Sequence, residues 1–209
     1  MPPDSNAREL RSAGLSRMPA RGIVLLDRDG TINCPPHGTR YITSRDEVSL
    51  IPGAATGLRA MRDAGVQLMV VTNQSGVGRG LMTHAALVGV NARLRELLEA
   101  EGVHLDAIYS CTHAPSDGCS CRKPATGMAD LALAGAGHSS GRVFVVGDDI
   151  VDIQLGRNIG AKTVLVRTGH GVEVERTGGH GADFVVDGLA QAAEIVVGLL
   201  DASMMPAAA

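Results

Sequence analysis

The chain has 209 residues, of which 44% are hydrophobic and 20% are charged, and its formal net charge is -3. This length suits one α/β domain with a sizeable core and leaves too little chain for two. The small net charge and the lack of a Lys/Arg run argue against nucleic-acid partners, and no apolar stretch is long enough to span a membrane.

Apolar segments that alternate with Gly-rich or polar loops predict a Rossmann-like α/β fold, with a mostly parallel sheet and helices on both faces. In chain order we predict strands at 22–27, 66–72, 106–110, 142–147, 162–166 and 183–186, and helices at 54–64, 83–100, 127–135, 150–159 and 188–200. Thr83 is the expected N-cap of the second helix. The stretch 168–181 is expected to be a mobile loop, in which His170 and His180 have no assigned role.

Residues 1–20 contain Pro, Ser and Arg without an apolar core stretch, which is unlike a signal peptide. We expect them to form a disordered tail before a single domain over 21–200. Because no export signal is present, we predict a cytoplasmic protein whose four cysteines are reduced, which favours metal binding over disulfides. We also expect a monomer without nucleic-acid or membrane partners.

Two carboxylates close the first predicted strand. The apolar run 23–26 leads into Asp27 and Asp29, and Gly30 follows at a sharp exit. Open α/β sheets place their chemistry at the carboxyl ends of their strands, where an unpaired buried carboxylate would be costly. A metal ion or a reacting phosphate would resolve this conflict. Two further predicted strands also end in polar side chains, at Thr72 and Asp148.

Three cysteines and one histidine lie within residues 111–121, in the pattern C-x-H-x5-C-x-C. Three thiolates and one imidazole satisfy a tetrahedral structural Zn²⁺ site, which would fold this single loop. The predicted ligands are Cys111, His113, Cys119 and Cys121. The alternatives are a chance cluster of reduced thiols and a redox pair formed by the last two cysteines. Cys34 lies outside the pattern and has no assigned role.

Four short motifs follow one another along the chain. They are Asp27-Arg28-Asp29-Gly30-Thr31, Thr72-Asn73-Gln74-Ser75-Gly76, Arg122-Lys123-Pro124 and Gly147-Asp148-Asp149, with Asp152 shortly after. Their content and order resemble the haloacid dehalogenase (HAD) superfamily. The Cys/His loop narrows the resemblance to the branch of D-glycero-D-manno-heptose 1,7-bisphosphate 7-phosphatases and the related histidinol-phosphate phosphatase domains. The intervals between the motifs are too short for an inserted cap domain, so a capless HAD fold is expected.

The resemblance implies a role for each motif. Asp27 would be the nucleophile, and Asp29 the general acid and base, because an alkoxide leaving group needs a proton. Thr72 and Lys123 would donate hydrogen bonds to the phosphoryl oxygens. Mg²⁺ would be held by the Asp27 carboxylate, the Asp29 backbone carbonyl and Asp148, since this cation prefers oxygen ligands.

Further residues are expected to contact the substrate. The predicted substrate-binding set is Thr72, Asn73, Gln74, Ser75, Arg122, Lys123 and Asp149. Asp149 departs from the branch, where a Lys commonly follows the ligand Asp, and its alternative role is that of an acid at a helix N-terminus. His37, Arg40 and Arg79 are either contacts for a remote phosphate or hydroxyl, or exposed loop residues.

The leading hypothesis is a Mg²⁺-dependent, zinc-stapled phosphomonoesterase that removes the 7-phosphate of a heptose bisphosphate through an aspartyl-phosphate. Alternatives are a histidinol-phosphate phosphatase, a broader small-molecule phosphatase, or a HAD-like module that binds a ligand without catalysis. Retention of all five motif side chains argues against the last: Asp27, Asp29, Thr72, Lys123 and Asp148. Asp27→Asn and Asp29→Asn are each expected to abolish turnover and leave the fold intact.

Overall fold

The computed structural model describes residues 20–34, 41–136 and 142–203. Its six strands form one parallel sheet in the order β3-β2-β1-β4-β5-β6. The strands are β1 Gly22–Leu26, β2 Val66–Asn73, β3 Ala107–Cys111, β4 Arg142–Gly147, β5 Lys162–Val166 and β6 Phe184–Val186. The helices are α1 Ala54–Asp63, α2 His84–Ala100, α3 Gly127–Gly135, α4 Ile150–Asn158, α5 Gly171–Thr177 and α6 Leu189–Ala202, with short 3-10 turns η1 Arg45–Glu47 and η2 Pro115–Asp117.

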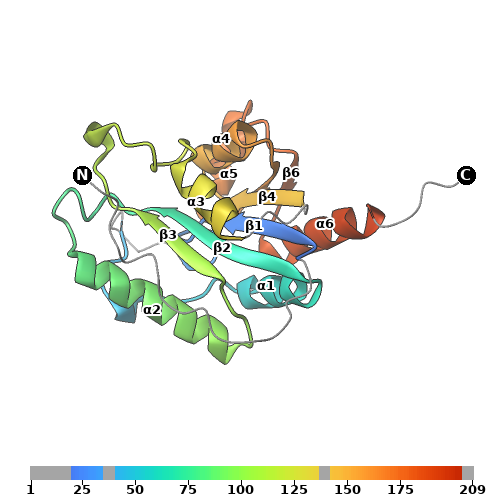
Figure 1. Cartoon of the computed structure of the whole chain (residues 1–209), viewed down its shortest axis with the longest axis horizontal. Coiled ribbons are helices and arrows are strands. Elements are labelled where there is room, and N and C mark those ends of the chain that lie inside the picture. Colours follow the sequence, from blue (N-terminus) through green and yellow to red (C-terminus); the bar gives the residue numbers. More distant parts are fainter. Residues whose placement is uncertain (1–19, 35–40, 137–141, 204–209) are drawn as a thin grey trace, which may run out of the picture.

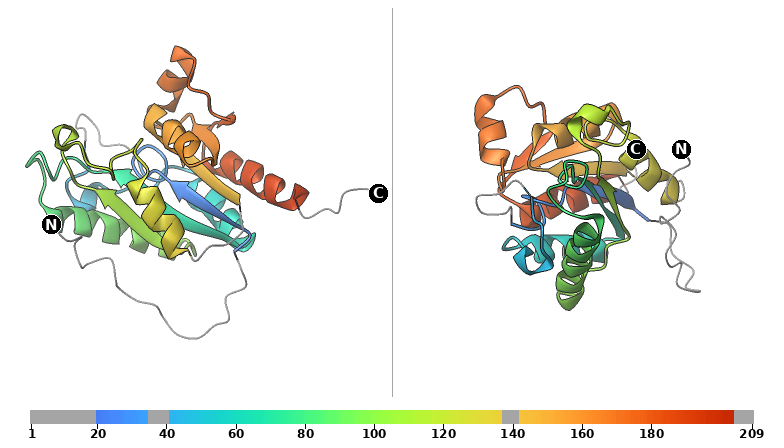
Figure 2. Two further views of the ribbon diagram at one scale, coloured as in Figure 1. Left: turned by 45° about the horizontal axis from the view of Figure 1, so that its top comes forward. Right: turned by 90° about the vertical axis from the view of Figure 1, so that its left-hand side faces the viewer.

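The sheet is buried on both faces, as its continuous apolar strands predict. Val24 and Leu26 of β1 belong to one core, and the alternating residues Ile23 and Leu25 belong to the other. Residues of α1, α2 and α6 close the first core, and residues of α3 and α4 close the second. Figures 1 and 2 show these two groups of helices on opposite sides of the sheet. The predicted α/β architecture is confirmed.

The strand order reverses at β1. From β1 the chain proceeds outward to β2 and β3, and it then returns to place β4 on the other side of β1. In open α/β sheets a crevice forms outside the carboxyl ends of the strands at such a switch point. The polar side chains that follow β1 and β4 are therefore brought to one place, although about 120 residues separate them.

The expected loop at 168–181 is wrong in part, because α5 occupies Gly171–Thr177. Arg167 donates to both carboxylate oxygens of Glu175, at 2.7 and 2.8 Å, and to Asp187 at 2.7 Å. Gly171 lies so close to the Val166 carbonyl that a Cβ would overlap it. These contacts across the end of β5 stabilise a helix that is too short for a periodic apolar pattern.

The other predicted elements agree with the structure to within two residues at each end. Thr83 caps α2 by accepting from the Ala86 N–H at 3.0 Å, as predicted. Between β1 and α1 the described residues contain only η1, which is consistent with a capless fold. Within the described ranges, no helix is long and apolar enough to cross a membrane. The predicted tail, apart from residue 20, and the loop residues His37 and Arg40 lie outside those ranges.

Candidate active site and Cys/His cluster

Three carboxylates converge where the carboxyl ends of β1 and β4 meet. The Asp27 N–H donates to the Val146 carbonyl at 3.0 Å, which ties the end of β1 to β4. Carboxylate oxygens of Asp27, Asp148 and Asp152 all lie within 4.8 Å of one another. The sequence-predicted nucleophile and metal ligand are thus brought together at the switch point, with a third acid from α4 beside them.

Lys123 lies among these acids and is buried. Its Nζ is 2.8 Å from Asp27 Oδ1 and 2.7 Å from Asp152 Oδ1. Burial alone would lower the pKa of Lys123, but the Asp152 and Asp27 carboxylates outweigh it and raise that pKa well above its usual range. The two carboxylates therefore favour the charged form of Lys123. One ammonium leaves three carboxylates undercompensated, a donor set of hard oxygens that fits a divalent cation such as Mg²⁺.

Two hydrogen bonds and two closely packed glycines surround the Asp148 carboxylate. Its Oδ1 accepts from Thr31 Oγ1 at 2.9 Å, and its Oδ2 accepts from the His170 backbone N–H at 2.9 Å. A Cβ at either Gly30 or Gly169, both at positive φ, would overlap the carboxylate. Burial, followed by the charge of Asp27, raises the pKa of Asp148 to about 7. A cation at this carboxylate would favour its ionised form.

Asp29 lies in a different environment, surrounded by N–H donors. It accepts from Arg28 Nε at 3.1 Å, Arg28 Nη2 at 2.8 Å, Asn33 Nδ2 at 2.9 Å and Gln74 Nε2 at 2.7 Å. Burial would raise the pKa of Asp29, but the Arg28 charge and these hydrogen bonds hold it below its ordinary value. The two acids of the first motif therefore have different partners: Asp27 pairs with Lys123, and Asp29 with Arg28.

The polar residues after β2 interconnect the site. The amide of Gln74 donates to Thr72 Oγ1 at 2.9 Å as well as to Asp29. Asn73 exchanges two hydrogen bonds with the backbone of Lys123, at 3.1 and 3.0 Å, and so fixes the loop that carries the lysine. Ser75 Oγ lies 3.0 Å from the Tyr41 hydroxyl. Each predicted substrate-binding residue of this motif thus has a partner within the protein, and substrate contact by them stays a prediction.

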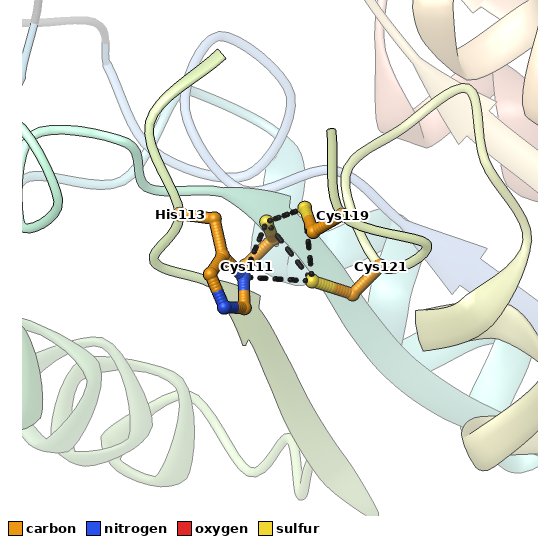
Figure 3. A group of neighbouring side chains, drawn as sticks. All are labelled: Cys111, His113, Cys119 and Cys121. Atoms are coloured by element: carbon orange, nitrogen blue, oxygen red, sulfur yellow. Dashed lines mark hydrogen bonds between the residues drawn. The ribbon is translucent and has the colours of Figure 1, made fainter. Parts of the chain in front are cut away.

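The four predicted zinc ligands meet at the carboxyl end of β3, whose last residue is Cys111. Figure 3 shows the three sulfur atoms and the His113 ring turned toward one another. The sulfur atoms are 3.2 to 3.6 Å apart, and His113 Nδ1 lies 3.1 Å from Cys121 Sγ. Ligands at about 2.3 Å from a tetrahedral Zn²⁺ are roughly 3.8 Å apart, so the cluster is close to the size of such a site. All four cysteines are free thiols, and Cys34 is near Leu50 instead.

Comparisons with known proteins identify the family of this chain. A model of the HAD-hydrolase-like family matches residues 120–192. The D-glycero-beta-D-manno-heptose-1,7-bisphosphate 7-phosphatase of Pseudomonas aeruginosa is 39% identical over 153 residues, which cover 73% of this chain and 85% of the relative. The enzyme of the same name from Yersinia pestis is 39% identical over 176 residues, with 80% and 90% covered. The chain belongs to the HAD family of phosphatases.

A solved structure extends this likeness to three dimensions. The D,D-heptose 1,7-bisphosphate phosphatase from B. bronchiseptica, complexed with magnesium and phosphate, has a TM-score of 0.78 and 33% identity. The match covers 85% of this chain and 98% of that structure. The fold described above is therefore that of a HAD phosphatase.

Two more residues of the substrate-binding prediction flank this HAD site. Asp149 is the N-cap of α4: its Oδ1 accepts from the Val151 N–H at 3.3 Å, and its Oδ2 lies 3.8 Å from His170 Nδ1. Arg122 has a buried Nη1 with no hydrogen-bond partner among the described residues. A buried guanidinium nitrogen without an acceptor fits an anionic ligand.

Sequence reasoning missed two features of the site. Arg28 is fully buried, and its position between two acids at the end of an apolar strand was the available signal. The turn at Gly169 and His170 holds Asp148 with a backbone N–H, which leaves no trace in residue type. His170, which had no assigned role, thus contributes through its main chain.

Proposed function

We propose that this chain is a phosphomonoesterase that forms an aspartyl-phosphate on Asp27 and removes the 7-phosphate of D-glycero-D-manno-heptose 1,7-bisphosphate. The observation that carries the proposal is the convergence of Asp27, Lys123, Asp148 and Asp152 at the β1–β4 junction. The substrate is inferred from the names of the relatives, and the chain spans most of their length. We further propose a monomer in the cytoplasm.

The residues divide the reaction between them. Asp27 attacks phosphorus as the P–O bond to the sugar breaks, and Asp29 gives a proton to the departing oxygen. Asp29 then removes a proton from water, whose oxygen attacks phosphorus as the P–O bond to Asp27 breaks, so that inorganic phosphate leaves and the Asp27 carboxylate is regenerated. Lys123, and Thr72 from strand β2, donate to the phosphoryl oxygens throughout. We infer that the Asp27 and Asp148 carboxylates and the Asp29 carbonyl would hold Mg²⁺, which would supply positive charge to offset the charge that develops in the reaction.

The supporting loop fits the same proposal. Only Arg122 separates Cys121 from Lys123, so a Zn²⁺ held by the Cys/His cluster would fix the direction of both cations. The unpartnered Nη1 of Arg122 is the candidate contact for the second phosphate or a sugar hydroxyl. A substrate with two anionic groups would use both cations, one at each phosphate.

Phosphate release tests the proposal directly. With Mg²⁺ present, kcat/KM would be measured for both anomers of heptose 1,7-bisphosphate, histidinol phosphate and several hexose phosphates. We expect one heptose anomer to be preferred at least a hundredfold, or about 2.7 kcal/mol of transition-state discrimination. A preference for histidinol phosphate would instead support the second candidate function.

Asp27→Asn tests whether Asp27 is the nucleophile. Asn has the same shape and no nucleophilic charge, and Lys123 keeps Asp152 as a partner at 2.7 Å. We expect turnover to fall at least a thousandfold while the thermal unfolding transition stays cooperative. Phosphate release at the unsubstituted rate by this variant would overturn the assignment of the nucleophile.

A further inference from the structure

Arg28 is the largest side chain that the described fold buries completely, with 0% exposure. A buried charge is costly unless it is paired and hydrogen-bonded. Its guanidinium forms a two-pronged contact with Asp29, from Nε to Oδ1 at 3.1 Å and from Nη2 to Oδ2 at 2.8 Å. Two parallel hydrogen bonds fix the plane of the carboxylate as well as its place.

The third guanidinium nitrogen is anchored from the opposite side. Arg28 Nη1 donates to Asn91 Oδ1 of α2 at 2.8 Å, and Asn91 Nδ2 lies 3.4 Å from Ser110 Oγ of β3. Residues from β3, α2 and the end of β1 thus form one hydrogen-bonded chain that ends at the Asp29 carboxylate. Arg28 cannot turn without losing contacts at both ends.

Each oxygen of Asp29 accepts one bond from Arg28 and one from a neutral amide. Asn33 completes Oδ1, and Gln74 completes Oδ2. A charged, two-pronged guanidinium holds a carboxylate more firmly than a neutral amide does. Arg28 is therefore the donor that fixes the direction of both Asp29 oxygens.

We propose that Arg28, anchored by Asn91, is a positioning residue that orients Asp29 for proton transfer to the leaving oxygen. This inference rests on the proposed phosphatase function. It adds a role for Arg28, a residue of the first motif to which the family resemblance assigns none. It makes a specific prediction, because only leaving groups that need a proton should depend on Arg28.

The experiment compares kcat/KM for two kinds of substrate, since this constant covers the steps through the first loss of the leaving group. Heptose bisphosphate releases an alkoxide and needs the acid, whereas p-nitrophenyl phosphate and acetyl phosphate release stable anions. We expect Arg28→Lys, which keeps the charge and loses the fork, to lower kcat/KM at least thirtyfold for the sugar. For the other two substrates the change should stay below threefold.

Arg62→Lys is the matched control. Arg62 pairs with Asp106 at 2.6 Å near the amino ends of β2 and β3, away from the acid cluster, so this variant should leave the ratio between substrates unchanged. If Arg28→Lys does not fold, Asn91→Ala removes only the anchor and should lower the ratio threefold to tenfold.

An unchanged ratio in a folded Arg28→Lys variant would overturn the inference. If kcat/KM fell equally on all substrates, Arg28 would serve the fold alone. Failure of the proposed function is distinguishable, because the unsubstituted enzyme would then release no phosphate from the sugar or Asp27→Asn would remain active.

Discussion

The acid cluster takes its carboxylates from positions 27, 148 and 152, whereas the Cys/His cluster takes all four ligands from residues 111–121. The first is built from the ends of two neighbouring strands and a helix, and Lys123 already compensates part of its charge. The second joins Cys111, the last residue of β3, to a loop with little regular structure beyond the short turn η2. The sheet preorganises the acid cluster, while the Cys/His cluster depends on its own ligands. Loss of a metal should therefore affect the two regions differently.

The largest effect is expected at the Cys/His cluster. Burial raises the pKa of the Cys111 thiol, so this residue becomes a ligand only through the metal charge. Removing zinc, or the change Cys119→Ser, should cost several kcal/mol and lower Tm by about 10 °C, because structural zinc contributes folding free energy. Activity should fall together with Tm, since the loop leads into Lys123. Metal analysis with thermal melts would check this.

Cys34→Ser is the control for that comparison, because Cys34 lies outside the cluster and contacts the Leu50 carbonyl instead. We expect no change in bound zinc or Tm. Freshly purified protein without zinc would contradict the assignment of the loop.

The next effect concerns the ion pair that stabilises the acid cluster. Asp152→Asn leaves buried Lys123 with Asp27 as its one carboxylate partner at 2.8 Å, and removing one member of a buried pair typically costs about 3–5 kcal/mol. Denaturant unfolding should show this loss. Asp149→Asn is the matched control, because Asn is also a good N-cap and Asp149 is half exposed. Equal stabilities of the two variants would mean that Lys123 does not need Asp152.

A smaller effect should appear as a dependence on pH. The folded-state pKa of Asp148, about 7, lies above its ordinary value of 3.8, so the folded protein binds the proton more tightly than the unfolded chain. Without Mg²⁺, this contribution to stability is fully present below about pH 4 and is lost as the pH rises through about 7. Mg²⁺ requires the ionised carboxylate and should stabilise the protein more at pH 8 than at pH 5.5. Thermal melts at both pH values, with and without Mg²⁺, would test this.

The sequence predicted those parts of the molecule that rest on local patterns. Apolar runs located all six strands, and acids at their ends located Asp27 and Asp148, because parallel strands place such residues on one edge. The close spacing of the Cys/His ligands similarly predicted their convergence, which the structure confirms.

Local sequence patterns could not predict contacts between residues that are far apart in the chain. Helix α5 depends on Arg167 reaching Glu175, and a stretch of seven residues carries no periodic signal for it. The pairing of Asp29 with Arg28 also depends on Asn91, from a helix more than sixty residues away. The prediction that Asp29→Asn leaves the fold intact therefore needs testing, since that change would leave a buried guanidinium without its carboxylate.

The smallest predicted effect concerns Gly169, whose backbone packs against the Asp148 carboxylate. Gly169 and Gly178 both have positive φ, at 55° and 69°, but a Cβ overlaps the Asp148 carboxylate only at Gly169 and meets nothing within 4 Å at Gly178. Alanine strains the backbone at both sites, but only at Gly169 would its Cβ also press on the turn that holds Asp148, including the Gly30 Cα. Gly169→Ala should weaken Mg²⁺ binding about tenfold, or about 1.4 kcal/mol, relative to Gly178→Ala in a calorimetric titration. Equal affinities would show that the carboxylate can move aside, and that this edge of the sheet is less rigidly preorganised than its contacts indicate.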